Sequence, residues 1–141
     1  MSISVYYIKK ELEKSEMKRK ILISVNPEHV DNIISGVKKY EYRRHIAKKD
    51  ISSIIIYETT PVKRVVAEAE IEAILSYTPD ELWELTKDES GISRFFFDKY
   101  FKGKEIAHAY RIGKVKVFKE KKTLQDFGVR CAPQSFVYIN Y

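Results

Sequence analysis

The chain has 141 residues, of which 44% are hydrophobic and 33% charged, and its net charge is +6. This length and composition are typical of one globular domain with its own core and exclude an intrinsically disordered chain. No apolar run approaches the roughly 20 residues of a membrane-spanning helix, and the N-terminus lacks the pattern of a secretory signal. The single cysteine excludes an internal disulfide, and three scattered histidines lack the spacing of a metal site. We therefore expect a cytoplasmic protein that uses no metal and no cofactor.

A helical arm is the first predicted element. Val5, Ile8 and Leu12 lie at roughly helical spacing with Lys and Glu between them, which predicts a helix outside the main domain. We therefore divide the chain into an N-terminal helical arm, residues 1–19, and a single domain, residues 20–141. Self-association through this arm, giving a homo-oligomer, is a hypothesis.

The domain begins with a short apolar strand at residues 21–25. Asn26 is placed to cap a helix with Pro27 at its first position, and Gly36 is placed to end it. Alternating and helical apolar patterns predict the remaining elements. These are strands at 38–46, 52–59 and 63–75, a helix opened by Thr78-Pro79, a helix over 94–101, a strand at 105–118 with a bulge or bend at Gly113, a turn over 123–128 and a strand at 135–140. Six strands with short flanking helices predict an α+β fold built on a small mixed β-barrel.

Charge is unevenly distributed along these elements. Residues 36–49 carry six lysines and arginines and one acid, and residues 99–130 carry ten and three. Between them, residues 68–89 carry eight acids and one lysine. If the two basic segments meet in space, they form a surface that attracts a polyanion such as RNA. The alternative is that lysines on strand edges only discourage aggregation.

The segment GVKKYEYRR, residues 36–44, concentrates the charges that can do chemistry. As a strand it projects Glu41 and Arg43 to one side and Lys38 with two tyrosines to the other. Lys38 and Glu41 form a candidate acid–base pair, because burial and neighbouring charges shift pKa values. Glu41 could take a proton from a ribose 2′-OH or from water while Arg43 stabilises phosphate charge. The same groups could instead bind phosphates and a base edge, or Glu41 and Arg43 could pair only to support the fold.

Three motifs in the right order resemble the ASCH domain family, part of the PUA-like β-barrel superfamily. The first is G-x-K-x-x-E-x-R, here Gly36, Lys38, Glu41 and Arg43. The second is the turn IYETTPVK, and the third is APQSF near the end of the chain. The resemblance covers about residues 21–141. It implies a compact barrel whose cleft carries the lysine, the glutamate and the arginine of the first motif.

The resemblance also implies a partner. Family members are thought to bind RNA or nucleotides, often in connection with translation or transcription. One branch is instead an amidohydrolase that deacetylates N4-acetylcytidine with a lysine and a threonine of the same segment. Lys38 matches that lysine, but Glu41 stands where the threonine is needed. The two hypotheses are therefore an RNA- or nucleotide-binding domain with a basic cleft, and a metal-independent hydrolase of ribonuclease or amidohydrolase type in which Lys38 and Glu41 are catalytic.

Further binding candidates surround the first motif. An exposed tyrosine ring can stack on an unpaired base, whereas a tyrosine of a small barrel more often packs at the rim of the core. Hydroxyl and amide groups of the turn and of the last strand can meet a base edge. The predicted RNA- or nucleotide-binding residues are Lys38, Glu41, Arg43, Arg44, Tyr57, Thr59, Gln134 and Ser135. The aromatic residues between Phe95 and Phe101 lie at helical spacing and predict packing of a helix against the barrel.

Overall fold

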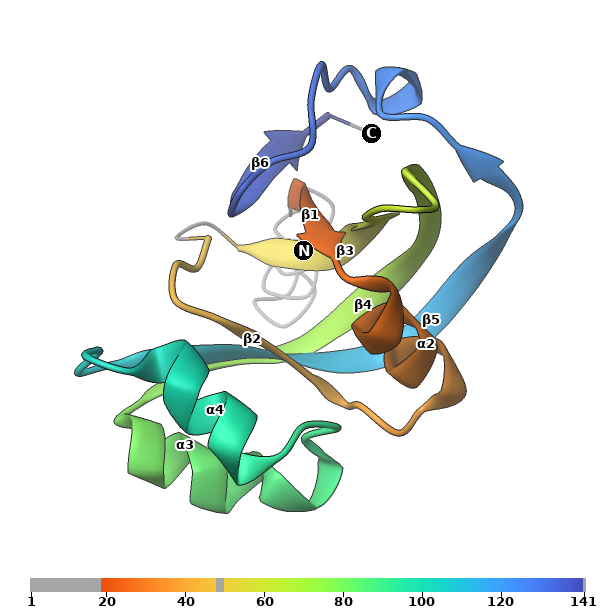
Figure 1. The fold of residues 1–141 in the computed structure, drawn as a ribbon. Coiled ribbons are helices and arrows are strands. Elements are labelled where there is room, and N and C mark those ends of the chain that lie inside the picture. Colours follow the sequence, from red (N-terminus) through yellow and green to blue (C-terminus); the bar gives the residue numbers. More distant parts are fainter. Residues whose placement is uncertain (1–18, 48–49, 141) are drawn as a thin grey trace, which may run out of the picture.

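A computed structural model describes residues 19–47 and 50–140, which form a six-stranded mixed sheet with short helices at its periphery (Figure 1). The elements are β1 Arg19–Val25, α2 Pro27–Ser35, β2 Tyr40–Arg43, β3 Ile51–Glu58, β4 Arg64–Tyr77, α3 Pro79–Thr86, the 3₁₀ turn η1 Lys87–Glu89, α4 Arg94–Phe101, β5 Ala107–Lys122, the 3₁₀ turn η2 Gln125–Phe127 and β6 Phe136–Ile139. The predicted α+β class is confirmed. The arm predicted at residues 1–19 lies outside the described residues except for Arg19, so the division of the chain and self-association through the arm stay predictions.

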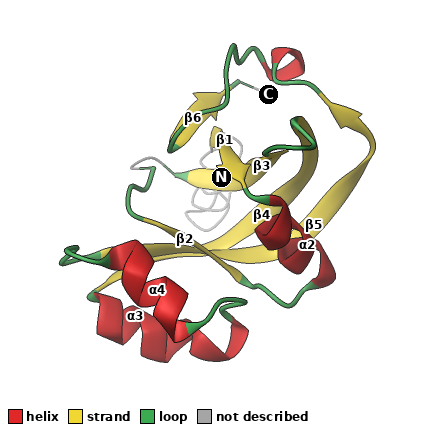
Figure 2. Cartoon of the chain, in the orientation of Figure 1, coloured by secondary structure: helices red, strands yellow, loops and turns green. Residues whose placement is uncertain are grey.

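The strands lie in the order β2-β5-β4-β3-β1-β6, with β1 parallel to β3 and the other pairs antiparallel. The long strands β4 and β5 curve so that the sheet wraps partly around itself (Figure 2). Within the described residues, however, no strand pairing joins β2 to β6, so the sheet is not closed and the predicted barrel is not confirmed. Both end strands have only four residues and therefore few backbone groups left for further pairing.

Strand β2 is much shorter than the strand predicted at residues 38–46. The reason is that the preceding backbone bonds elsewhere: the Lys38 N–H donates to the Asn32 carbonyl oxygen and the Lys39 N–H to that of Glu89, each at 2.9 Å. These two bonds fix the chain just before β2 to the end of α2 on one side and to η1 on the other. The prediction placed a strand at Lys38 and Lys39, where the backbone N–H groups instead form hydrogen bonds to α2 and η1.

Strand β5 extends beyond its predicted end, and the predicted irregularity at Gly113 is confirmed. Ala69 of β4 lies opposite Val115, whereas Ile71 lies opposite Ile112, so β5 has one extra residue at this point. Such a bulge increases the local bend of a strand.

The ends of α2 were predicted correctly in position and partly wrongly in chemistry. Gly36 ends the helix in the left-handed region at φ 85°. Asn26 occupies the N-cap position, but its side chain makes no capping hydrogen bond. Its Oδ1 accepts instead from the Thr59 hydroxyl at 3.2 Å, which ties the start of α2 to the end of β3.

Apolar side chains fill both faces of the sheet. Val30 and Ile33 of α2 pack on one face, and Leu124 and Phe127 on the other. This two-sided burial explains why β1 reads as a continuous apolar run rather than an alternation. A third cluster packs α3 and α4 against β2, β4 and β5, and Figure 1 shows the two helices side by side next to β2. None of the helices in the described part of the chain is long and apolar enough to cross a membrane.

Candidate functional site

A cavity of about 160 Å³ lies between the start of α2, strand β2 and helix α4. It brings together three of the residues predicted from the sequence with others that were not predicted as site residues, among them His29 and Tyr100. Its charged and titratable lining residues are His29, Lys38, Glu41 and Arg43, and its aromatic ones are Tyr42, Phe96 and Tyr100. Cations, a carboxylate and rings around one small space can together hold an anionic, planar ligand.

Lys38 is almost completely buried, with 2% of its surface exposed. Its Nζ donates to the Ser90 carbonyl oxygen at 3.2 Å and lies 4.6 Å from the centre of the Tyr42 ring. Burial lowers the pKa of Lys38, and Arg43 adds to this while Glu41 opposes it. A lysine whose pKa is lowered gives up its proton more readily, so Lys38 can both stabilise negative charge and act as a general acid.

The position of Lys38 depends on the loop that follows η1. Gly91 adopts φ +68°, and a Cβ atom added to it would lie 2.5 Å from the Lys38 Cβ. No other residue therefore fits this close approach without moving the lysine or the loop. Ser90, beside it, supplies the carbonyl group that Lys38 binds.

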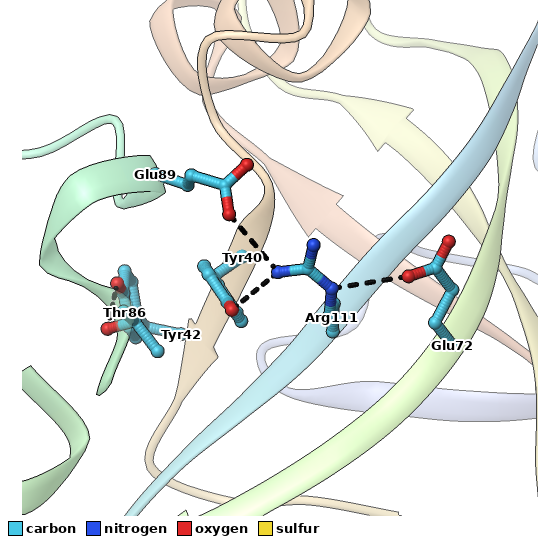
Figure 3. Close-up of polar contacts among 6 residues, drawn as sticks. All are labelled: Tyr40, Tyr42, Glu72, Thr86, Glu89 and Arg111. Atoms are coloured by element: carbon cyan, nitrogen blue, oxygen red, sulfur yellow. Dashed lines mark hydrogen bonds and ion pairs between the residues drawn. The ribbon is translucent and has the colours of Figure 1, made fainter.

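Two tyrosines of β2 help to attach the end of α3 and η1, which precede this loop, to the sheet (Figure 3). Arg111 Nη1 on β5 donates to the Tyr40 hydroxyl at 2.5 Å and to Glu89 Oε1 at 3.4 Å. The Tyr42 hydroxyl donates to Thr86 Oγ1 at 2.7 Å. Burial raises the pKa of Tyr42 to about 12, which keeps this hydroxyl protonated as a donor. The two tyrosines are thus buried supports of the site rather than exposed stacking platforms.

Glu41 and Arg43 lie side by side with incomplete hydrogen bonding. Arg43 Nε is 3.4 Å from Glu41 Oε1, within ion-pair range but without the geometry of a hydrogen bond. Arg43 Nη2 donates to the Ser24 carbonyl oxygen at 2.8 Å, and Nη1 lies 3.5 Å from that of Ser135. The guanidinium therefore connects β2 with β1 and with the residue before β6, near the two ends of the sheet.

Three buried polar atoms of the cavity have no hydrogen-bond partner among the described residues. They are His29 Nδ1, Glu41 Oε2 and Arg43 Nε. Buried polar groups in folded proteins are nearly always paired, because leaving one unpaired costs roughly 1–3 kcal/mol. The residues that carry these three atoms all line one cavity, which marks it as a place where a polar ligand can complete the hydrogen bonding.

His29 makes the stability of the domain sensitive to pH. Burial lowers the pKa of His29 below 6.5, and the Lys38 charge lowers it further. Below pH 6.5 the unfolded chain therefore takes up a proton that the folded protein resists, so folding stability falls with falling pH. We expect wild type to lose more free energy of unfolding than His29→Gln between pH 7.5 and pH 5, measured by urea denaturation. Equal losses in the two proteins would contradict this role of His29.

The remaining predicted binding residues do not line the cavity. Arg44 is exposed, with its guanidinium carbon 4.5 Å from the centre of the Tyr100 ring at the cavity. Ser135 contributes its carbonyl oxygen to Arg43. The structure does not bring Tyr57, Thr59 or Gln134 to the cavity lining: Tyr57 is buried in the core cluster that contains Leu124 and Phe127, Thr59 binds Asn26, and Gln134 is exposed.

Sequence reasoning missed His29 and treated Tyr100 only as a packing residue. A signal for His29 existed, because it lies four residues before the buried Ile33 and therefore on the inward face of α2. No comparable signal existed for Tyr100. In the same helix the packing prediction is right for Phe97 and Phe101 but wrong for Phe95, which is 79% exposed.

The acidic segment, residues 68–89, is largely paired within the protein. Glu68 lies 2.8 Å from Lys20, and Glu72 and Glu89 both contact Arg111. The basic segments meet only in part: β2 pairs with residues 108–111 of β5, whereas the lysines over 114–122 lie on the other half of that strand, beside β4. The cavity is therefore basic mainly through its own residues and Arg44.

Comparisons with known proteins agree with this fold. An ASCH domain-containing ribonuclease of Zymomonas mobilis is 37% identical over 94 residues, 66% of this chain and 64% of that protein. The large ribosomal subunit protein uL22 of Ureaplasma parvum is 24% identical over 128 residues, 90% of this chain and 41% of that protein. The chain thus spans less than two thirds of the length of either relative. The crystal structure of ASCH from Zymomonas mobilis matches with a TM-score of 0.79 at 31% identity, covering 86% of this chain and 88% of that one.

The family match covers the elements that form the cavity. The family model of the ASCH domain matches residues 23–116, which include α2, β2 and α4. Both the motif residues Lys38, Glu41 and Arg43 and the newly found His29 lie inside this range. The family predicted from the three sequence motifs is confirmed: the chain belongs to the ASCH domain family.

Proposed function

We propose that this domain binds single-stranded RNA, with one nucleotide in the cavity at His29, Lys38, Glu41 and Arg43. The observation that carries the proposal is a set of three buried polar atoms without a hydrogen-bond partner among the described residues, which belong to residues that line one cavity together with a buried lysine. The cations suit a phosphate, the carboxylate suits a ribose hydroxyl or the amino edge of a base, and Tyr100 suits the face of a ring. A volume of about 160 Å³ admits a group the size of a base and excludes a duplex. The name of the Zymomonas mobilis relative, a ribonuclease, supports RNA as the partner.

Arg44→Ala is expected to weaken RNA binding without unfolding the domain, because Arg44 is exposed and stands beside the cavity on the Tyr100 ring. If it contacts a phosphate, its loss lowers the slope of log affinity against log salt by about 1. Fluorescence anisotropy with a labelled single-stranded RNA over a salt series measures this slope. Arg130→Ala is the matched control, because Arg130 is also exposed and does not line the cavity. Its slope should stay closer to that of wild type than the slope of Arg44→Ala. An Arg44→Ala slope identical to that of wild type would remove Arg44 from the interface.

Cleavage of the bound RNA is a second candidate function. It is favoured by the buried Lys38 with its lowered pKa, which lines the same cavity as Glu41, and by the Glu41 Oε2 atom, which has no hydrogen-bond partner among the described residues. In this reaction the Glu41 carboxylate accepts the proton of a ribose 2′-OH, and the oxygen attacks the adjacent phosphorus. The bond to the 5′-oxygen of the next nucleotide breaks, and Lys38 donates a proton to that oxygen. The products are a 2′,3′-cyclic phosphate and a 5′-hydroxyl, and Arg43 stabilises the charge on phosphorus.

A link to translation is part of the same proposal. A segment similar to this chain lies within a ribosomal protein of Ureaplasma parvum, which supports a setting rich in RNA. The amidohydrolase alternative has less support, since the position of its threonine is occupied by Glu41, whose side chain is only 8% exposed and pairs with Arg43. Incubation with N4-acetylcytidine distinguishes the ribonuclease from the amidohydrolase, because only the amidohydrolase releases acetate.

A further inference from the structure

A second, wider groove of about 490 Å³ adjoins the cavity. His29, Ile92 and Phe96 line both, so the two form one continuous surface. Val37 and Glu28 line the groove but not the cavity. The groove therefore begins where the proposed nucleotide site ends, with the His29 ring at the junction.

Apolar side chains face water along this groove. Val37 is 59% exposed and Phe96 is 44% exposed. The Phe96 ring meets the His29 ring edge-on at 5.5 Å and lies nearly parallel to the Tyr100 ring, at 6° between the planes. This packing holds Phe96 in a defined orientation while leaving much of it uncovered. A fixed, half-exposed aromatic ring beside a polar site is a common platform for an unpaired base.

The charge of the groove differs from that of the cavity. Lys38 and Arg43 line the cavity, whereas the lining of the groove within the described residues contains neither lysine nor arginine. Its ionisable side chains are the carboxylate of Glu28 and the imidazole of His29. A phosphate is disfavoured beside the Glu28 carboxylate, because no lysine or arginine lines the groove within the described residues, whereas an uncharged aromatic base is not disfavoured there. The groove thus fits a base rather than the backbone of RNA.

We propose that the groove is a second nucleotide subsite, which holds the base next to the nucleotide in the cavity. This inference rests on the proposed binding of RNA. The base stacks on Phe96, and the phosphate that joins the two nucleotides stays at the cavity with Lys38 and Arg43. Because the carboxylate of Glu28 only accepts hydrogen bonds, the subsite favours a base with an exocyclic amino group, as in cytosine or adenine, over uracil.

The first test separates the groove from the cavity with the full chain and two probes, cytidine monophosphate and a cytidine hexanucleotide. Val37→Asp changes only the groove and replaces an exposed residue, so the fold is retained. It is expected to weaken hexanucleotide binding about tenfold and to leave monophosphate binding within twofold. Ile106→Asp, which adds the same charge at a site 46% exposed that lines neither surface, is the matched control and changes neither affinity more than twofold.

The second test examines stacking and the preference for an amino group. Phe96→Ala is expected to weaken hexanucleotide binding by about five- to a hundredfold, the usual range for a lost base stack. Phe95→Ala removes a ring that lines neither surface and has no such effect. Glu28→Gln, which can donate as well as accept, is expected to reduce the preference for the cytidine over the uridine hexanucleotide.

The outcomes distinguish the second subsite from the proposed RNA binding on which it rests. If Val37→Asp and Phe96→Ala bind the hexanucleotide like wild type while Arg44→Ala binds it less well, the groove is not a subsite and RNA binding stands. Equal losses for monophosphate and hexanucleotide in Val37→Asp would also overturn the second subsite. If wild type binds no RNA at low salt, the proposed function fails and the subsite with it.

Discussion

Glu41→Gln is expected to lower the rate of RNA cleavage by about 10²–10⁴-fold, the contribution usual for a general base. The substitution keeps the shape of the side chain and removes its ability to take a proton. Glu41 lines the cavity, and its buried Oε2 has no hydrogen-bond partner among the described residues, so we expect this oxygen to accept the proton of the 2′-OH. Single-turnover cleavage of a labelled single-stranded RNA, with separation of the products, measures the rate.

A matched control and a binding measurement make this test decisive. Glu105→Gln is the same substitution at an exposed position that does not line the cavity, and it should cleave like wild type. Lys38→Met should lose activity to a similar extent, because it removes both the charge and the proton donor. If Glu41→Gln is folded, binds RNA and cleaves it within a few-fold of the wild-type rate, Glu41 is not the base. If wild type binds RNA and leaves it intact, the domain is a binding module without this reaction.

Gly91→Ala is expected to destabilise the domain by roughly 2–4 kcal/mol and to disturb the site at the same time. The left-handed backbone at φ +68° costs a residue with a side chain about 1–2 kcal/mol. The new methyl group would also lie 2.5 Å from Lys38 Cβ and 3.0 Å from its Cα, so the loop or the lysine must move. Urea denaturation measures the loss of stability, and RNA affinity reports the displacement of Lys38.

Gly103→Ala separates the two causes of that loss. Gly103 has φ +79°, but a Cβ added there meets no atom within 4 Å. Its substitution therefore carries the backbone strain without the clash, and the expected loss is about 1–2 kcal/mol with unchanged RNA affinity. If Gly91→Ala and Gly103→Ala lose equal stability and bind RNA equally well, the contact between Gly91 and Lys38 does not matter for the site.

Arg43 shows how closely the fold and the site depend on each other. Its guanidinium binds main-chain carbonyl groups of Ser24 and Ser135, and it pairs with Glu41 at the cavity. Among the residues that the structure describes, no strand pairing between β2 and β6 closes the sheet, and the Arg43 side chain connects the two regions instead. An arginine can do both because its planar group offers several donors at once. Loss of Arg43 therefore affects stability as well as binding, which is why Arg44 is the better probe of the interface.

Much of the fold could be predicted because its signals are local. The strand at 21–25, the helix from Pro27 to Ser35 and the bulge near Gly113 follow from periodicity, from proline and glycine at helix ends and from a glycine within a strand. The length of β2 could not be predicted, since the backbone of Lys38 and Lys39 bonds to residues of α2 and η1. The strand propensity of a segment does not record hydrogen bonds that its backbone forms with distant residues in place of strand pairing.

The sequence by itself determined the family, the class of fold and the charged motif, because these depend on residue types at fixed spacings along the chain. Only the tertiary structure decided which groups meet. It placed His29 from α2 and Tyr100 from α4 beside Lys38, Glu41 and Arg43, and it left Tyr57 in the core. It also showed that Gly91, more than fifty residues after Lys38, holds the lysine in place. The physical reason is that burial and unpaired hydrogen-bonding groups arise from packing between distant segments, and no spacing within one segment records them.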